Sequence, residues 1–124
     1  MADSFHNLEI WKKAYELVLI IYSCTRDFPA SERYILVDQL RRSSNGIVAN
    51  IAESQGRYSY KDKVRVLYQA RGEIFETRSH LKVAEGLKLI SSVKFRQIDT
   101  EYEGLLVGLN RYIGYLTRKT DKTS

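Results

Sequence analysis

The sequence has few residues of the kinds that break helices, form disulfides or bind metals. Its 124 residues include one proline and one cysteine, Cys24, so the chain forms no disulfide within itself. Its two histidines, His6 and His80, do not provide the ligand spacing of a zinc site. These absences exclude a disulfide-stapled domain and a zinc module. They favour a reducing compartment, and we expect the protein to be cytoplasmic.

Long apolar segments are also missing. The longest apolar run, "LVLII" at residues 17–21, is far too short to cross a bilayer. The start, "MADSFHNLEI", contains an acidic residue and lacks the basic-then-apolar layout of a signal peptide. We therefore expect no membrane association.

The motifs of common catalytic sites are absent as well. There is no glycine-rich phosphate loop ending in Lys-Ser/Thr and no Gly-x-Ser-x-Gly elbow. A di-metal bundle needs Glu-x-x-His pairs, whereas Glu76 lies four residues before His80. Cys24 lies off the expected helix seam, so we interpret it as a packing residue rather than a nucleophile. The sequence argues against an enzyme and predicts no metal and no cofactor.

Positive charge is present in excess, and it is concentrated. The chain has a net charge of +5, and residues 33–71 carry all of it, with eight Lys/Arg against three Asp/Glu. A basic block favours acidic partners, of which nucleic acid is the commonest. The alternative is a solvated face that only keeps the protein soluble.

Apolar residues recur at helical spacing along nearly the whole chain. The pattern predicts four amphipathic helices over residues 8–26, 32–55, 60–87 and 92–117, and short turns between them favour an all-α, antiparallel up-down four-helix bundle. We expect Ser31, Ser59 and Ser91 to cap the last three helices. Gly56 is expected to end the second helix in the left-handed conformation.

Two helices carry distinctive seams. The fourth alternates steps of three and four without a fault, through Phe95, Ile98, Tyr102, Leu105, Leu109, Tyr112 and Leu116. Gly104 and Gly108 beside this seam predict a close helix contact, which would offset their helix-propensity cost. In the first helix we expect one face to be formed by Leu8, Trp11, Tyr15, Val18, Leu19 and Tyr22. Leu17, Ile20 and Ile21 then point away, which predicts a second buried surface and self-association.

The third helix combines cations with aromatic rings. Lys61, Arg65, Tyr68, Arg71, Phe75, Arg78 and Lys82 share one broad side. Guanidinium groups contact phosphates and rings stack on bases, so this side favours single-stranded nucleic acid. The candidate nucleic-acid-binding residues are Arg42, Arg57, Lys61, Arg65, Arg71 and Arg78. The alternative is that Tyr68 and Phe75 are core, with Arg71 and Arg78 paired to acids of another helix or subunit.

Several segments resemble a known family. "FHNLEIWKKAYELV", "FPASERYILVDQLRRSSNGIVANIAES", "GRYSYKD" and "LYQARGEIFET" are similar to the four-helix bundle proteins encoded in intervening sequences of bacterial 23S ribosomal RNA genes. The accessory variability proteins of diversity-generating retroelements look like distant relatives. The resemblance implies a ring-like homopentamer with a basic surface. It also implies association with RNA or DNA and, as in the retroelement relatives, with a reverse transcriptase.

The residues that match the family pattern include Asn50, Glu53, Gly72 and Glu76, and the resemblance implies close packing and polar links for them. Ser43, Gly46 and Ser54 are expected to thin the second helix so that a neighbour can approach, while Asn50 and Glu53 hydrogen-bond across the bundle. Ser54 stands where the family usually has glycine. Lys63 stands where an aromatic is common, and we expect it to extend outward and add to the basic patch.

Two hypotheses follow from these patterns. The first is a non-enzymatic oligomeric bundle that binds RNA or single-stranded nucleic acid through its basic face. The second is a protein-interaction scaffold whose arginines hold subunits or a partner protein.

Overall fold

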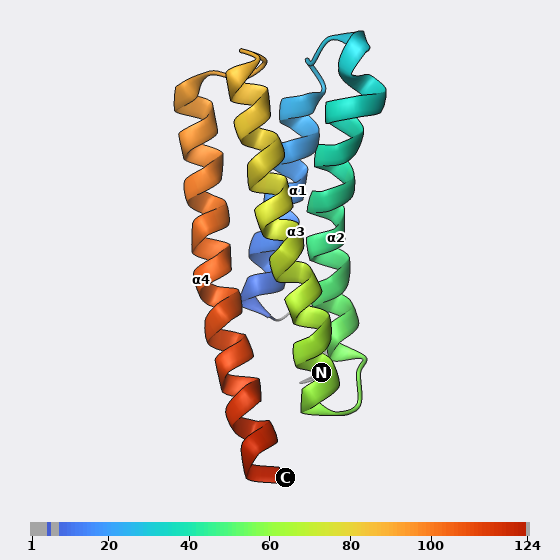
Figure 1. The fold of residues 1–124 in the computed structure, drawn as a ribbon, viewed down its shortest axis with the longest axis vertical. Coiled ribbons are helices and arrows are strands. Elements are labelled where there is room, and N and C mark those ends of the chain that lie inside the picture. The colour runs from blue at the N-terminus through green and yellow to red at the C-terminus, as the bar shows by residue number, and fades with distance from the viewer. Residues whose placement is uncertain (1–4, 6–7, 124) are drawn as a thin grey trace.

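The structure, a computed structural model, describes Phe5 and residues 8–123, the side chains of 121–123 excepted. Its main elements are helices α1 (Glu9–Thr25), α2 (Asp38–Gln55), α3 (Tyr60–Gly86) and α4 (Ser92–Thr123). The helices lie side by side and their connections alternate between the two ends of the bundle (Figure 1). The described residues contain no strand. The predicted all-α four-helix bundle is confirmed.

The seam of α4 faces the core as the spacing predicts. Ile98, Tyr102, Leu105, Leu109 and Leu116 are buried, while Phe95 and Tyr112 at its two ends are half-buried. The core also takes Leu40, Ile47 and Ile51 from α2 and Leu67, Ile74 and Leu81 from α3. None of the described helices has a stretch apolar and long enough to span a membrane.

The predicted core face of α1 is wrong for Tyr15, Leu19 and Tyr22, although Val18 is buried and Leu8 and Trp11 pack against the core. Leu17 and Ile21 are at most 1% exposed, whereas Tyr15, Leu19 and Tyr22 are 45%, 52% and 38% exposed. The buried face consists of Ala14, Leu17, Val18, Ile21 and Thr25. Periodicity could not identify the buried stripe because this helix is apolar almost all round. The prediction favoured the stripe with large aromatic side chains over the stripe that contains the small Ala14 and Thr25. The surplus apolar surface exists, and it is formed by Ile20 together with Tyr15, Leu19 and Tyr22, three residues expected to be core.

The ends of α2 differ from the expectation. Ser31 is not an N-cap, because a 3₁₀ turn (Ala30–Glu32) and a π-helical turn (Arg33–Val37) precede α2. Gly56 has a right-handed φ of −85°, so it is not a left-handed stop. The ammonium group of Lys63 donates to the backbone carbonyls of Ser54 and Gln55 at 3.2 Å, which satisfies the end of α2. The prediction that Lys63 extends outward is therefore also wrong.

The other caps are as expected. The Ser59 hydroxyl accepts from the backbone N–H of Asp62, and the Ser91 hydroxyl from that of Lys94, both at 3.0 Å. Among the described residues other than glycine, Lys88 alone has a positive φ, 63°, in the α3–α4 connection.

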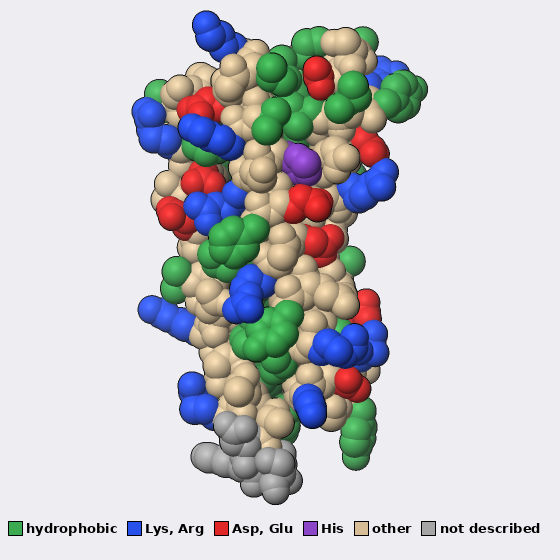
Figure 2. All heavy atoms as spheres, in the orientation of Figure 1, with side chains coloured by type: hydrophobic (Ala, Val, Ile, Leu, Met, Phe, Trp, Pro, Cys, Tyr) green, Lys and Arg blue, Asp and Glu red, His purple; other side chains and the backbone are tan. Residues whose placement is uncertain are grey.

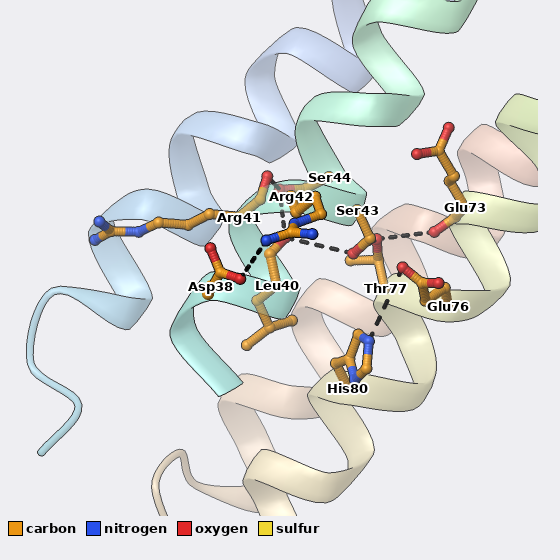
Figure 3. Close-up of polar contacts among 10 residues, drawn as sticks. All are labelled: Asp38, Leu40, Arg41, Arg42, Ser43, Ser44, Glu73, Glu76, Thr77 and His80. Atoms are coloured by element: carbon orange, nitrogen blue, oxygen red, sulfur yellow. Dashed lines mark hydrogen bonds and ion pairs between the residues drawn. The ribbon is translucent and has the colours of Figure 1, made fainter. Parts of the chain in front are cut away.

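Small polar residues lie between α2 and α3, where the two helices pack along each other. The hydroxyls of Ser43 and Thr77, both at most 1% exposed, share a hydrogen bond of 2.7 Å (Figure 3). Ser44 and Ser54 return their hydroxyl hydrogens to the carbonyls of Leu40 and Ile51. Each of these buried hydroxyls is thus hydrogen-bonded, so the small side chains are buried without leaving an unsatisfied polar group.

Candidate nucleic-acid interface

The α3 residues Tyr68 and Phe75 are not core residues of this chain. Tyr68 is 47% exposed and Phe75 54% exposed, because both lie on the side of α3 that turns toward α4 and the solvent. Figure 2 shows apolar and basic side chains alternating along the surface formed by α3 and α4. We call Tyr68, Arg71, Phe75, Arg78, Lys82 and Phe95 the cation–aromatic face.

Each cation of this face lies over a ring. The Arg71 guanidinium is 4.6 Å from the centre of the Tyr68 ring, and that of Arg78 is 5.9 Å from the centre of Phe75. The Lys82 ammonium is 5.1 Å from the ring of Phe95 on α4. Such contacts orient the long side chains along the surface and stabilise each by about 0.5–1 kcal/mol at exposed sites.

Arg78 is held by acids of the neighbouring helix. Its guanidinium donates to both carboxylate oxygens of Asp99, at 2.7 and 3.2 Å, and lies 3.5 Å from Glu103. The side chains of Arg78 and Asp99 are only 22% and 21% exposed. The hydrogen bond to Asp99 raises the pKa of Arg78 above its usual range. This arginine joins α3 to α4, and its charge is neutralised within the chain.

Arg71 has a neutral partner instead. It donates to the side-chain oxygen of Asn110 on α4 at 3.1 Å. No carboxylate of the described residues lies within ion-pair distance of Arg71 or of the exposed Lys61. Of the six candidate residues, these two keep an uncompensated positive charge.

The remaining candidates have exposed local partners. Arg42 pairs with Asp38 at 2.6 Å, Arg57 pairs with Glu53, and Arg65 lies 3.6 Å from Asp62. The Glu53 contact raises the pKa of Arg57. Exposed pairs of this kind contribute little to stability, so their arginines remain able to exchange a carboxylate for a phosphate.

The structure brings only some of the candidates together. Arg71 and Arg78 lie on the cation–aromatic face, and Lys61 and Arg65 continue it along α3 toward the α2–α3 connection that contains Arg57. Arg42 lies on α2 and not on α3 or α4, and Figure 3 shows it reaching back to Asp38 on the same helix. Lys82, which the sequence placed on this side of α3, and Phe95 also belong to the face, and Asn110 contacts it through Arg71. None of the three was among the candidate binding residues. The positions on α4 could not be found from sequence, because they depend on how α4 is aligned with α3.

Of the residues that match the family pattern, Asn50 and Glu53 lie on α2 and Gly72 and Glu76 on α3, and none belongs to the cation–aromatic face. Asn50 donates to the carboxylate of Glu73, and Glu76 lies 4.0 Å from His80 (Figure 3). Glu53 contacts Arg57 rather than a group across the bundle, which corrects the expectation for it. Gly72 is exposed, and nothing described in this chain lies within 4 Å of its missing side chain, so it serves no close packing within the subunit.

The carboxylate of Glu73, on α3, packs against α2. Gly46 makes room for it, since a side-chain carbon on Gly46 would overlap the Glu73 carboxylate. Burial raises the pKa of Glu73, assisted by the charge of Glu76 and opposed by the Asn50 hydrogen bond. Among the described residues, no three His, Cys, Asp or Glu side chains are grouped so as to hold a metal ion.

These observations define a helical bundle that displays cations and aromatic rings together on α3 and α4. The chain belongs to the family described as 23S rRNA-intervening sequence protein, whose model matches residues 6–111.

The fold is similar to a crystal structure of a protein with unknown function from the S23 ribosomal protein family of Bacteroides thetaiotaomicron. The TM-score is 0.79 and the identity 22%, over 85% of this chain and 95% of that one. Comparison with curated proteins gave no match.

Proposed function

We propose that the protein is a non-enzymatic, oligomeric helical bundle of the cytoplasm that binds RNA or single-stranded nucleic acid through its cation–aromatic face. The observation that carries this proposal is Arg71, which lies over the exposed Tyr68 ring and has no carboxylate partner among the described residues. A guanidinium beside an exposed ring offers a phosphate contact next to a base-stacking surface.

The neighbouring residues extend this site along α3. Lys61 and Arg65 are exposed cations on the same helix, one of them without a carboxylate partner in the described chain. Phosphate contacts supply sequence-independent affinity through the release of counterions, and each stacked base adds roughly 1–3 kcal/mol. The face therefore suits a strand bound without strong sequence preference.

Oligomerisation, to a ring-like pentamer as in the family, is the second part of the proposal. It is supported by the exposed apolar residues of α1, which are Tyr15, Leu19, Ile20 and Tyr22. Several copies around an axis would repeat the cation–aromatic face, and a strand that touches two copies gains affinity through effective concentration.

The test is fluorescence anisotropy with a labelled single-stranded RNA over a series of salt concentrations. Changing Arg65 and Arg71 to glutamate together should weaken binding by at least about tenfold at low salt. It should also reduce the slope of log K against log salt by about 1–2, since each lost phosphate contact lowers it by roughly 0.7.

Changing Arg111 and Arg118 to glutamate together is the control matched in charge, because both are exposed residues of α4 outside the cation–aromatic face. Binding that does not change with salt, or a loss in the control equal to that in the double variant, would remove the proposal.

The second candidate is a protein-interaction scaffold, for example a partner of a reverse transcriptase. The Arg78 pair favours it, because that arginine already serves to hold two helices together. In that case the Arg65 and Arg71 double variant would break the oligomer or the partner complex. Neither the wild type nor the variant would bind nucleic acid. Size-exclusion chromatography with light scattering separates these outcomes.

A further inference from the structure

A second concentration of arginines lies at the end of the bundle where α1 connects to α2, apart from the cation–aromatic face. A hollow of about 330 Å³ there is lined by Arg26, Arg33 and Arg41 together with Thr25 and the Phe28–Ala30 turn. Its volume is at the lower end of the range of about 300–1,000 Å³ for small-molecule sites. No acidic side chain lines it.

Arg41 is fixed in position at this hollow. Its Nε–H donates to the buried Thr25 hydroxyl at 3.0 Å, and Nη2 donates to the carbonyl of Tyr22 at 3.3 Å. The guanidinium also lies 4.5 Å from the centre of the Tyr22 ring. Figure 3 shows this side chain extending from α2 toward α1, whereas Arg42 reaches Asp38 on its own helix. Two of its five N–H groups are used, so it is oriented in advance and still has donors to offer.

Acidic residues are near these arginines in the sequence, since Asp27 follows Arg26 and Glu32 precedes Arg33, but neither pairs with them. No carboxylate of the described residues lies within ion-pair distance of Arg26, Arg33 or Arg41, and the nearby Asp38 is paired with Arg42. Three cations around one hollow repel each other, and a half-buried guanidinium without a counter-charge is costly. A bound anion removes both costs, and guanidinium groups match the geometry of phosphate.

The π-helical turn Arg33–Val37 builds the next part of the surface. Tyr34 lies in this turn beside Arg33 and is 84% exposed. A second hollow of about 550 Å³ shares Arg33, Val37 and Arg41 with the first and also includes Tyr34 and the paired Asp38 and Arg42. Single π-helical turns are frequent at functional sites. An exposed ring next to a phosphate site is a stacking surface for a base.

We propose that this hollow binds the phosphate group of a nucleotide unit through Arg26, Arg33 and Arg41, with the base against Tyr34. The phosphate comes either from a free mononucleotide or from the backbone of a strand. This proposal does not depend on the cation–aromatic face, and it stands if that face binds a partner protein instead.

The experiment is a ³¹P NMR titration at low salt with three probes: inorganic phosphate, AMP and the dinucleoside monophosphate ApA. All three probes report on the phosphate itself. The wild-type protein should bind AMP saturably, and Arg33→Gln should weaken this binding by about tenfold or more, as expected for loss of a charged hydrogen bond. Arg33 is exposed and forms no ion pair with a described residue, so the change should leave the melting temperature unaltered.

Further variants locate the two halves of the ligand. Tyr34→Ala should weaken the binding of AMP but not that of inorganic phosphate. Arg41→Lys should weaken the binding of both ligands. If Arg41→Lys impairs folding, the same loss of binding in Arg26→Gln confirms the assignment. Arg111→Gln is the control of equal charge on α4, and the Arg65 and Arg71 double variant should bind AMP like the wild type.

Equal affinity for ApA and AMP would assign the site to backbone phosphates, and preference for AMP to a free nucleotide. Absence of saturation up to about 10 mM AMP, which means a binding free energy weaker than roughly 3 kcal/mol, would overturn the proposal. So would an equal loss in Arg111→Gln and Arg33→Gln.

Discussion

The pair formed by Arg78 and Asp99 is the most shielded of the ion pairs found between described residues, with each side chain about one-fifth exposed. Its two hydrogen bonds fix the planes of guanidinium and carboxylate against each other, which a surface pair does not achieve. Removing Asp99 leaves the Arg78 guanidinium with only the longer contact of 3.5 Å to the exposed Glu103. This contact therefore contributes to how α3 and α4 are aligned.

We predict that Asp99→Ala lowers the free energy of unfolding by about 1–3 kcal/mol, because Arg78 loses its main acceptor. Urea denaturation followed by circular dichroism measures it, and a double-mutant cycle with Arg78→Ala should give a coupling of about 1 kcal/mol. The same cycle between the exposed Arg42 and Asp38 is the control and should give at most about 0.5 kcal/mol. Equal couplings would show that Arg78 is an ordinary surface charge.

Glu73 makes stability depend on pH at the level of one residue. Its pKa is raised in the folded state, mainly by burial, from an ordinary value of 4.5. A group with a raised folded pKa contributes its full stability below the unfolded pKa, and this contribution is lost as the pH rises through the folded pKa. Ionised Glu73 is thus unfavourable at neutral pH.

Glu73→Gln should therefore be more stable than the wild type at pH 7, by up to about 0.5 kcal/mol for this half-exposed group, and the difference should vanish below about pH 4. The amide oxygen of glutamine can still accept from Asn50. Thermal melts across this pH range provide the measurement, and Glu16→Gln controls for the change in net charge. A variant less stable than the wild type at pH 7 would contradict the assignment.

At the scale of elements, the two glycines of α4 have different surroundings. A side-chain carbon on Gly108 would lie 3.2 Å from Cγ2 of Ile10, so α1 crosses closely there. One on Gly104 would meet nothing within 4 Å among the described atoms. The predicted close contact of a Gly-x-x-x-Gly pair is thus made within the chain by Gly108 and not by Gly104.

Gly108→Leu should destabilise the bundle by about 1–3 kcal/mol through overpacking against Ile10. Gly104→Ala should instead stabilise it by about 0.5–1 kcal/mol, because alanine favours the helix and has room. Differential scanning calorimetry of both variants is the measurement. An unchanged melting temperature in Gly108→Leu would mean that α1 and α4 are not close at this point.

At the scale of the whole molecule, α1 exposes more apolar surface than a bundle helix needs. Tyr15, Leu19 and Ile20 are 45%, 52% and 36% exposed, and Tyr15 stacks on Trp11 at 5.2 Å. Contiguous apolar surface on a folded protein marks an interaction site. We expect this surface to be covered by a second copy of the chain.

Leu19→Glu should weaken self-association by at least tenfold, since full burial of a leucine contributes about 1.5–3 kcal/mol, and leave the helical content unchanged. Light scattering coupled to size-exclusion chromatography measures the mass at micromolar concentration. Val93→Glu changes an exposed apolar residue on another helix and serves as the control. A wild-type protein that is monomeric at this concentration would contradict the proposed oligomer.

The sequence by itself determined the features that depend on neighbours along the chain. The four-helix fold, the α4 seam and the caps Ser59 and Ser91 follow from spacing and local hydrogen bonds, so they could be predicted. The concentration of cations and rings on one side of α3 could also be predicted, because residues three and four apart share a helix face.

Only the tertiary structure decided which stripe of α1 is core, because that helix is apolar on several sides and packing against the other helices determines which side is buried. It also decided that Arg78 pairs with Asp99 while Arg71 does not meet an acid, and that Arg26, Arg33 and Arg41 surround one hollow. The physical reason is the same in each case. Contacts between helices depend on their relative rotation and alignment, which are set by packing of the whole core rather than by any local pattern.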